Sequence, residues 1–432
     1  MVVLKMGNTQ NKLNGNKLSN ETVLTICILF IGILLRFGLA IVLPYDISGH
    51  DLGFWPTNDN PDCMGHLGYT AYIYYTGHLP DFDPYLKYSI YNPPVHYWIN
   101  AHFMFILRAV GVSLAGQLES LQLLTALYSS LTLVFSYLIF GRLSENKKTI
   151  CYATLAVAIQ PSFTFGAAQV GNDTLALLFA ILTIYFIVLW HQTDKVRYLI
   201  ITAFTLGLGM MTKLNVVLMA PAIAYFMLLH LIKRIKAKKG IVKTIFSYLA
   251  FGAISVPLGT WWSIKNYILF DLPLGYIDEP SKTSLQHITD QSFINRFIPN
   301  IANLTYPFVD GDTTTPRGDQ SIFLTVLKHA LFDNSYVENL TEPVRIVFLI
   351  AMYIAIIITV IAIVFSIKNT VKAVKNKDEI IIFAWIGIIT YVASLIVFCF
   401  RFPYVCTQDF RYIAPAFVLF IMTLRKKKTA AN

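Results

Sequence analysis

The amino-acid sequence predicts an all-α polytopic membrane protein with about ten or eleven transmembrane helices and two large non-cytoplasmic loops bearing interfacial helices. Of its 432 residues, 56% are hydrophobic and only 13% are charged. The mean hydropathy of +0.58 is far above that of a soluble chain. Apolar runs close to the length that crosses about 30 Å of hydrocarbon recur along the whole sequence. These observations exclude a water-soluble globular protein.

The candidate transmembrane helices are spread over the whole chain. The long apolar runs are 22–43, 118–140, 150–165, 174–190, 198–211, 214–232, 245–270, 344–367, 380–400 and 413–424. A shorter run, 95–110, is ambiguous. The first run follows several lysines but has no small-residue cleavage site, so we expect it to be a retained helix and not a removed signal peptide.

Charge sets the expected orientation. Basic residues gather in short segments between the apolar runs, at 147–148, 195–197, 233–243, 368–377 and 425–428. Because Lys and Arg are enriched in cytoplasmic loops, these segments are assigned to the cytoplasm. The net charge of +10 then reflects topology, and no nucleic-acid binding is expected. The segments left for the opposite, outer face are 44–94, 169–173, 212–213, 271–342 and 401–412.

This orientation divides the chain and raises a parity problem. The expected segments are a cytoplasmic N-terminal segment 1–21, a transmembrane catalytic module 22–270 including the outer loop 44–94, an outer loop or cap 271–342, C-terminal transmembrane helices 343–424 and a basic cytoplasmic tail 425–432. An odd number of crossings must join loop 44–94 to the basic segment at 147–148. One of the runs 95–110 and 118–140 is therefore partial or re-entrant, and 95–110 is the favoured one.

The outer loop 44–94 is rich in chemistry-bearing side chains. It contains six aspartates, three histidines and eight tyrosines, with Lys87 as its only basic residue. His66, Tyr69 and Tyr72 recur at helical spacing, which predicts an interfacial helix over 65–76. The alternative for most of the tyrosines is an aromatic belt at the lipid headgroups.

Two aspartates of this loop are candidate general bases. Asp51 follows His50 directly, and Asp62 precedes His66 by four residues. A carboxylate placed against a hydroxyl can take its proton in the transition state, which contributes about 10² to 10⁴ in rate. The structural alternative for both is a loop cap or an Asx-turn.

Further polar residues stand where outer loops enter apolar runs. Asn92 precedes two prolines that set a rigid helix entry, and His96 lies in the first turn of that helix. Asn172 and Asp173 open another run, where either would cap the helix and complement its dipole. Asp173 could also orient a substrate or a metal ion from the same side as Asp51.

Several cations break the positive-inside pattern. Lys213, Lys265, Arg401 and Arg411 lie at helix ends on the outer face, and Arg36 lies inside the first run. Snorkelling to lipid phosphates explains each one singly, and Arg36 could instead pair with Asp46. Together the four outer cations favour one shared site for a bound anion, and Arg36 points the same way. The fork of arginine suits phosphate oxygens.

The order of these motifs resembles a family, the membrane glycosyltransferases of the GT-C fold, in the branch of protein O-mannosyltransferases and lipid A aminoarabinose transferases. The segments that carry the resemblance are His50-Asp51, 65–69, 92–97, Asn172-Asp173, 209–215 and 409–415. The resemblance implies that Asp51 matches the catalytic aspartate of the first loop. It departs from the family in having His50-Asp51 in place of an Asp-Glu pair and in lacking a large soluble C-terminal domain.

The resulting hypothesis is an inverting glycosyltransferase that moves a sugar from a polyprenyl-phosphate donor to a lipid, glycan or protein acceptor on the non-cytoplasmic face. The expected catalytic residues are Asp51, Asp62 and Asp173. The expected substrate-binding residues are His50, His66, Tyr69, Asn92, His96, Asn172, Lys213, Lys265, Asp409, Arg411 and Tyr412. We expect Asp51, Asp173, Lys213 and Arg411 to converge on one outer cavity. Loop 271–342 should fold over that cavity and carry a surface-lying amphipathic helix over 322–331.

Several alternatives stay open at this point. A secondary transporter or lipid flippase is the rival function, although no internal repeat supports it. No cofactor is certain: a Gly-rich nucleotide loop is absent, and a divalent metal is left open because the Asp and His residues lack a ligand spacing. A multi-pass location in the plasma membrane, in contact with its lipids, is favoured over the endoplasmic reticulum. A disulfide between Cys63 and Cys406 is left undecided.

Overall fold

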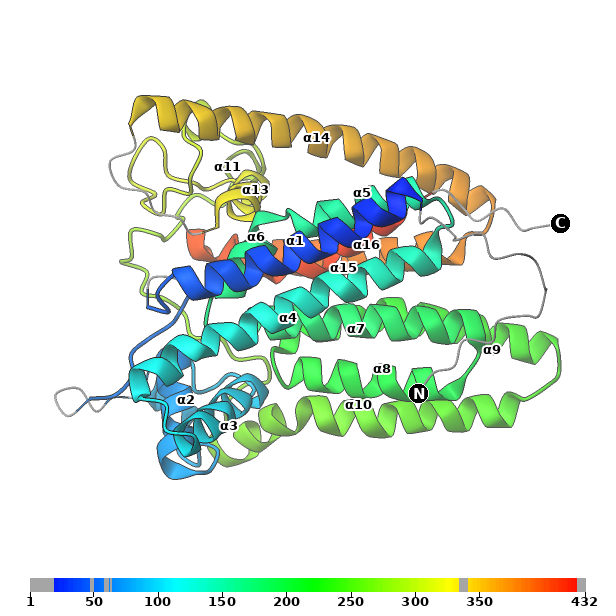
Figure 1. Cartoon of the computed structure of the whole chain (residues 1–432), viewed down its shortest axis with the longest axis horizontal. Helices are drawn as coiled ribbons and strands as arrows, with labels where there is room; N and C mark the ends of the chain where they lie inside the picture. The colour runs from blue at the N-terminus through cyan, green and yellow to red at the C-terminus, as the bar shows by residue number, and fades with distance from the viewer. Residues whose placement is uncertain (1–18, 47–49, 58–61, 63, 334–340, 426–432) are drawn as a thin grey trace.

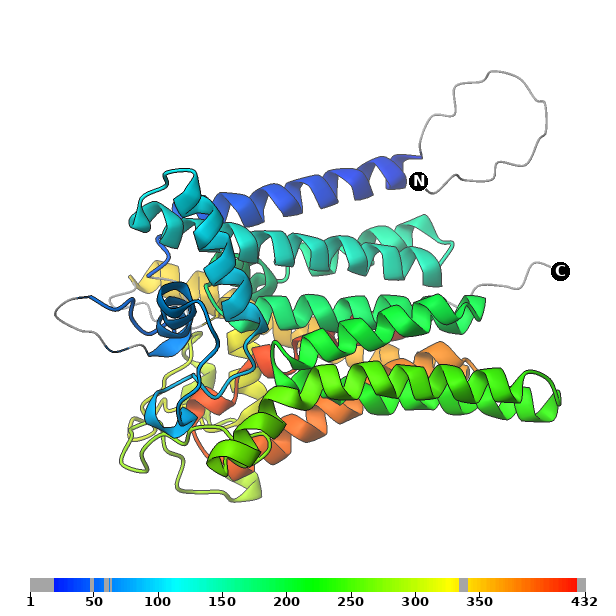
Figure 2. The same ribbon diagram turned by 90° about the horizontal axis from the view of Figure 1, so that it is seen from below.

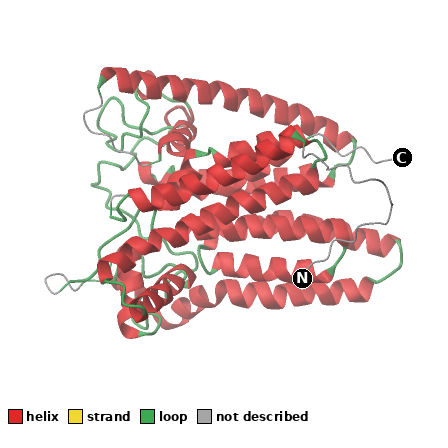
Figure 3. Ribbon diagram, in the orientation of Figure 1, coloured by secondary structure: helices red, strands yellow, loops and turns green. Residues whose placement is uncertain are grey.

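The computed structural model describes residues 19–46, 50–57, 62, 64–333 and 341–425. Within these ranges it is a helical bundle without strands, apart from two isolated β-bridges (Figure 3). The predicted all-α membrane class is confirmed. Cys63 and most of the two predicted terminal segments lie outside the described residues, so the disulfide question is not addressed.

The described residues contain seven helices that are long and apolar enough to cross a membrane. These are α1 (Asn20–Val42), α4 (Leu114–Leu143), η3 (Leu214–Met219) continued by α9 (Ala220–Lys236), α7 (Asn172–Thr193), α10 (Ile241–Phe270), α14 (Glu342–Lys375) and α15 (Glu379–Arg401). They run side by side along the long axis of the molecule (Figures 1 and 2). α14 is the most peripheral, since only 6% of its apolar window is buried.

Three of the ten predicted runs are broken or short. α5 (Lys147–Ala158) meets the segment of α6 (Pro161–Phe165) and η2 (Gly166–Ala168) at 61°. Likewise η4 (Val405–Thr407) and η5 (Phe410–Tyr412) meet α16 (Ala414–Thr423) at 50°. A proline in the first turn of α6 and of α16 lacks the backbone N–H that a continuous helix would need. α8 (Val196–Met210) has only 15 residues.

Small residues allow α8 to pack closely against α10. A Cβ atom at Gly207 would lie 2.9 Å from the Leu258 side chain, and one at Gly259 would lie 2.7 Å from the Met210 sulfur. Such close approach is the usual way in which helices associate in lipid, where no hydrophobic effect drives them together. The packing holds the end of α8 and the following residue Lys213 at a defined place.

Arg36 has a structural role that the sequence did not predict. Its side chain is fully buried, and it donates to Ser129 Oγ at 2.8 Å, to Ala158 O at 3.2 Å and to Val157 O at 3.3 Å. The carbonyls belong to the last turn of α5, where a helix leaves such groups without partners. Arg36 therefore stabilises the break after α5. The predictions of a site residue, of snorkelling and of a pair with Asp46 are wrong.

The first outer loop packs over one end of the bundle, here called the cap end. α2 (Gly65–Thr76) lies against α3 (Val95–Ala109), with Tyr69 and Tyr97 stacked at 4.0 Å between ring centroids. Most of α2 is buried, which is more than an interfacial helix would show. α3 has only 15 residues and is not among the candidate spans, in agreement with the parity argument.

The second outer loop also folds onto the cap end. It carries α11 (Phe293–Phe297), α12 (Ile301–Leu304) and α13 (Ile322–Phe332), and α13 packs against α6 and η5. The expectation of a surface-lying helix is wrong, because Lys328 and His329 of α13 are buried. Lys328 is tolerated there because its ammonium group contacts both Asp319 carboxylate oxygens, at 2.8 and 2.9 Å.

We predict that this buried pair holds the second loop in place. Asp319→Ala should lower stability by about 3–5 kcal/mol because it leaves the Lys328 ammonium buried without a counterion. Thermal unfolding and limited proteolysis of the purified protein measure the effect. The matched control is Glu342→Ala, which breaks the exposed pair with Arg345 and should cost about 1 kcal/mol or less. Equal unfolding temperatures and equal protease resistance in the two variants would contradict the prediction.

Candidate active site

The candidate residues meet around one guanidinium at the cap end. Arg411 lies 3.5 Å from Asp51 (Nη2 to Oδ2), 3.6 Å from Asp173 (Nη1 to Oδ2) and 3.4 Å from Asp409 (Nε to Oδ2). Lys213 forms an ion pair with the same Asp173. Four of the predicted residues, Asp51, Asp173, Lys213 and Arg411, are thus linked by direct contacts.

Local structure places the Arg411 side of this cluster. The Asp409 carboxylate accepts a hydrogen bond from Arg411 N at 2.9 Å and so caps the short η5 helix. The turn leads into the bent junction with α16, which projects the Arg411 side chain back toward the start of α7. Asp409 is buried, so its charge needs the neighbouring cation.

The Asp173 side is placed by the ends of two helices. Asp173 lies in the first turn of α7, where the helix dipole favours a carboxylate. Asn172 donates from its amide to Thr212 O at 3.2 Å and ties the start of α7 to the end of α8. Lys213 follows in an extended conformation and reaches Asp173. The predicted cap by Asn172 or Asp173 is wrong, because Gly171 is the N-cap residue of α7 and no side chain of the described residues caps the helix. The site role of Asp173 stays a prediction.

Asp51 is held by an unusual backbone turn. Its φ of 57° is in the left-handed region, and its carbonyl accepts from His66 N at 3.0 Å. The loop touches the start of α2 so closely that a Cβ atom at Gly65 would lie 2.5 Å from Gly53 Cα. Glycine is required there, and this contact directs Asp51 toward Arg411.

The environment keeps Asp51 ionised. Burial would raise the pKa of its carboxyl group, but the Arg411 guanidinium and a 2.7 Å hydrogen bond from the Tyr88 hydroxyl hold that pKa below its usual value. Asp51 is still 41% exposed. An ionised and accessible carboxylate is what the transfer of a proton from a hydroxyl requires.

The sequence reasoning missed three members of the site. Tyr88 binds Asp51, Asp333 lies 3.3 Å from His50 Nε2, and Gln169 donates to Asp333. His50 also lies 3.8 Å from Asp409. Tyr88 was hidden among eight tyrosines, and Asp333 lies in a loop far along the chain. The assignment of segment 169–173 to the outer face was the one sequence feature that pointed to Gln169.

A buried layer of aromatic and polar groups lies behind the site. His66 Nδ1 lies 2.9 Å from the Tyr97 hydroxyl, and His96 Nε2 lies 3.0 Å from the Asn100 amide. Burial lowers the pKa of His66 to about 4, so its imidazole is neutral near pH 7. Tyr69 is also fully buried. His66, Tyr69 and His96 were predicted to bind substrate. In the structure they lie in the buried layer behind the loop that carries Asp51.

Two predicted site residues lie apart from the cluster in their described contacts. Asp62 has a 67% exposed side chain and pairs with Lys87 at 3.2 Å. Lys265 donates to Pro80 O at 2.7 Å and lies over the Trp262 ring. Arg401, the fourth outer cation, is exposed and lies over Phe402. The expectation of one shared site for all four outer cations is therefore wrong.

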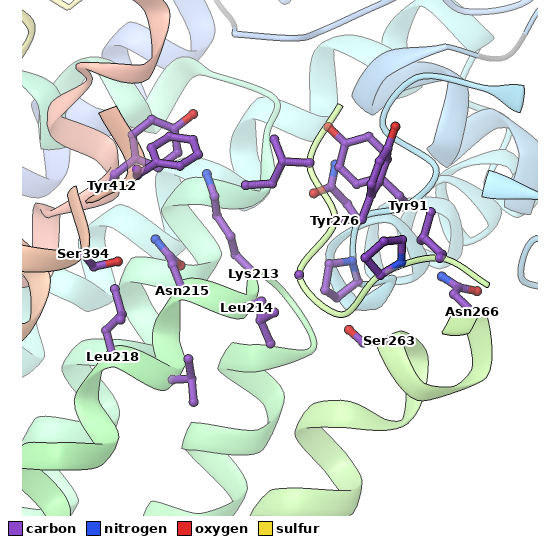
Figure 4. A pocket seen from close by; sticks show the side chains of 18 of the residues that line it. Tyr91, Lys213, Leu214, Asn215, Leu218, Ser263, Asn266, Tyr276, Ser394 and Tyr412 are labelled. Atoms are coloured by element: carbon purple, nitrogen blue, oxygen red, sulfur yellow. The ribbon is translucent and has the colours of Figure 1, made fainter. Parts of the chain in front are cut away.

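A cavity of about 310 Å³ opens beside Lys213 (Figure 4). Its walls are mainly apolar, and they include the predicted residues Asn92 and Tyr412. Lys213 projects between Asn215 and Tyr412 in this view, and its Nζ atom is 4.9 Å from the Tyr412 ring centroid. A smaller space of about 50 Å³ lies on the other side, against His50, Asp173 and Arg411.

The same carboxylates do not form a metal site in this arrangement. Among the described residues, no group of three or more His, Cys, Asp or Glu is placed to hold a metal ion. Arg411 occupies the position between Asp51, Asp173 and Asp409 that a cation would take. Of the two cations, Lys213 lines the cavity of about 310 Å³ and Arg411 lines the space of about 50 Å³.

The sequence comparison bears on the chemistry. Residues 91–261, less than half of the chain, match the family of dolichyl-phosphate-mannose-protein mannosyltransferases. This match confirms the prediction of a membrane glycosyltransferase. The matched segment contains Asp173 and Lys213, whereas Asp51, Asp409 and Arg411 lie outside it. A comparison with curated proteins finds no match.

Two kinds of solved structure resemble the chain at low identity. One is ArnT from Cupriavidus metallidurans, bound to undecaprenyl phosphate, with 13% identity, a TM-score of 0.42, and coverage of 93% of this chain and 77% of that one. The other is the oligosaccharyltransferase of Archaeoglobus fulgidus, with 12% identity, a TM-score of 0.49, and coverage of 93% and 50%.

The hydrogen bond from Tyr88 gives a pH prediction. Tyr88→Phe removes a donor to the ionised Asp51 carboxylate, so the pKa of Asp51 should rise. Activity should then be lost at a higher pH as the medium is acidified, which moves the acid limb of the kcat/KM profile for sugar transfer to higher pH. Tyr353→Phe is the control, because that hydroxyl binds Leu304 O away from the site. An acid limb that stays in place in Tyr88→Phe would show that Asp51 does not control it.

Proposed function

We propose that the chain transfers a sugar from a polyprenyl-phosphate donor to a hydroxyl group of an acceptor on the non-cytoplasmic face of the membrane. The observation that carries the proposal is the cluster in which Arg411 and Lys213 share Asp173, with Lys213 also lining an apolar cavity. A phosphate that carries a prenyl chain matches both features: two fixed cations suit its oxygens, and an apolar wall suits its tail.

Donor binding would rearrange the charges of the site. In the structure, Lys213 and Arg411 form ion pairs with carboxylates. A donor phosphate would replace some of these contacts. The prenyl chain would lie along apolar wall residues such as Leu218, Leu395 and Phe398. The single phosphate then stands between the cations and the catalytic carboxylates, which brings the C1–O bond of the sugar close to Asp51.

The reaction follows from these positions. Asp51 takes the proton of the acceptor hydroxyl while its oxygen attacks C1 of the sugar from the face opposite the phosphate. The bond between C1 and the phosphate oxygen breaks, and polyprenyl phosphate leaves with inversion at C1. Lys213 and Arg411 stabilise the negative charge that develops on the leaving phosphate, where fixed cations contribute most. Asp173 orients the sugar and the two cations.

The rival functions fit the charge distribution less well. The ion pairs of Arg411 and Lys213 lie at the cap end, and a large buried apolar cluster fills the bundle between α4, α7, α8 and α15. A transporter or flippase places its binding groups near mid-membrane between repeats. In this proposal the acceptor hydroxyl belongs to a lipid, a glycan or a protein, and the membrane is the plasma membrane.

The direct test of the function uses purified protein and a panel of polyprenyl-phosphate sugars. We expect release of free polyprenyl phosphate from at least one donor in the presence of an acceptor hydroxyl, and a product of inverted anomeric configuration by NMR. Absence of release from every donor, together with movement of an intact lipid between leaflets of proteoliposomes, would favour the flippase instead.

Asp51→Asn should abolish turnover and leave donor binding nearly intact. Asparagine preserves size and hydrogen bonding but cannot accept the proton, so the loss should be about 10² to 10⁴ in rate. The matched control is Asp83→Asn on the same loop, because Asp83 caps η1 and asparagine caps equally well. Retention of more than about a tenth of the rate, a loss below about 1.4 kcal/mol in barrier, would remove Asp51 as the base.

Arg411→Lys should affect the donor and not the proton transfer. Lysine keeps the charge but loses the planar fork that contacts two or more carboxylates and would contact phosphate oxygens. The KM for the donor should rise about tenfold, equivalent to about 1.4 kcal/mol. Steady-state kinetics at varied donor concentration measure it, and an unchanged KM would show that Arg411 does not bind the donor.

A further inference from the structure

The cavity beside Lys213 contains one polar side chain whose hydrogen bonds are unmet. Asn266 of α10 is 1% exposed, and neither its amide nitrogen nor its amide oxygen has a partner among the described residues. Of the buried Asn and Gln side chains in those residues, only Asn266 lacks partners at both amide atoms. A buried amide without partners costs about 1–3 kcal/mol, so a purely structural role does not explain why asparagine stands there.

The position of Asn266 is held by the chain on both sides. Its backbone carbonyl accepts from Leu272 N at 3.3 Å, which fixes the turn that ends α10. One turn earlier, Trp262 is buried and donates from its indole to Tyr91 O at 3.3 Å. The backbone of Asn266 is therefore fixed at the end of α10, one turn from a contact with Tyr91.

The surroundings of Asn266 have the composition of a carbohydrate site. The cavity wall around it includes Ser263 and the aromatic residues Tyr91 and Tyr276, and Figure 4 shows these side chains grouped at one end of the cavity. The rings of Tyr91 and Tyr276 pack edge to face, with centroids 5.3 Å apart. An amide offers a donor and an acceptor that match adjacent hydroxyls, and tyrosine combines an apolar ring with a polar tip.

The connection that follows α10 closes this end of the cavity. The segment 272–277 follows α10 and lines the cavity. It turns at Gly275, whose φ of 73° is in the left-handed region, and Tyr276 also packs against Tyr85 of the first outer loop at 4.8 Å between centroids. The polar end is therefore enclosed by both outer loops, and the same cavity reaches Lys213 at its other side.

We propose that Asn266 is a specificity-determining residue that binds adjacent hydroxyl groups of a sugar in this end of the cavity. The inference rests on the proposed function for the identity of the reaction. It adds a residue that distinguishes one sugar from another. The hydroxyls belong either to the donor sugar or to a sugar of the acceptor, since both must come within reach of the leaving phosphate at Lys213.

The test compares Asn266→Leu with wild type in thermal-shift titrations and in kinetics. Leucine keeps the branched shape and removes both polar atoms, so the variant should be at least as stable as wild type. Thr260→Val is the matched control, because Thr260 lies on the same helix, donates to Val256 O at 2.7 Å and does not line the cavity. The probes are bare polyprenyl phosphate, polyprenyl-phosphate mannose and other polyprenyl-phosphate hexoses or pentoses, and free methyl glycosides.

We expect Asn266→Leu to bind bare polyprenyl phosphate like wild type and to bind one class of sugar probe about tenfold more weakly, as loss of one or two hydrogen bonds requires. Weaker binding of the sugar-loaded donors alone assigns Asn266 to the donor sugar. Weaker binding of the methyl glycosides alone assigns it to the acceptor. In either case, discrimination between sugars that differ in one hydroxyl should decline in kcat/KM.

Equal affinities of wild type and Asn266→Leu for all probes would overturn the proposal, and so would equal losses for bare and sugar-loaded polyprenyl phosphate. These results are independent of the proposed function, which fails instead if wild type releases no polyprenyl phosphate from any donor. A loss of sugar affinity in Asn266→Leu without any wild-type turnover would keep the sugar site and remove the transferase reaction.

Discussion

The Arg411 guanidinium is the group on which the cap end depends. Removal of a cation from water costs several kcal/mol unless counterions and hydrogen bonds replace the lost hydration. Asp51, Asp173 and Asp409 supply that replacement from three separate parts of the chain. The first outer loop, the start of α7 and the turn before α16 must therefore come together, and the same condition creates a charged site beside a cavity.

Helix ends provide the remaining machinery. α7 begins, α8 stops and α16 is bent away at the same level of the bundle. Each end leaves backbone groups without helical partners and allows polar side chains to project into one space. The dipole of α7 stabilises the Asp173 carboxylate, and Lys213 follows the end of α8. Small residues between α8 and α10 then fix the spacing of these ends.

The family match and the site overlap only in part. The matched residues 91–261 contain Asp173, Lys213 and the apolar helices around them. Asp51 comes before this segment and Arg411 after it. Only the folding of the chain brings the candidate base and the cation next to Asp173. The charge cluster is therefore independent support for a site at this end, because the match by itself does not include the residues that complete it.

The sequence by itself determined the membrane class, the positions of most long helices and the choice of Asp51, Asp173, Lys213 and Arg411 as candidates. Hydropathy acts over one helix length, and a charged residue at a membrane edge is visible without any partner. Only the tertiary structure decided which candidates meet. The structure removed Arg36 from the candidate site residues, because its guanidinium donates to carbonyls at the end of α5. It added partners such as Tyr88, Asp333 and Gln169, because contacts between distant segments depend on packing and left-handed turns that no local pattern encodes.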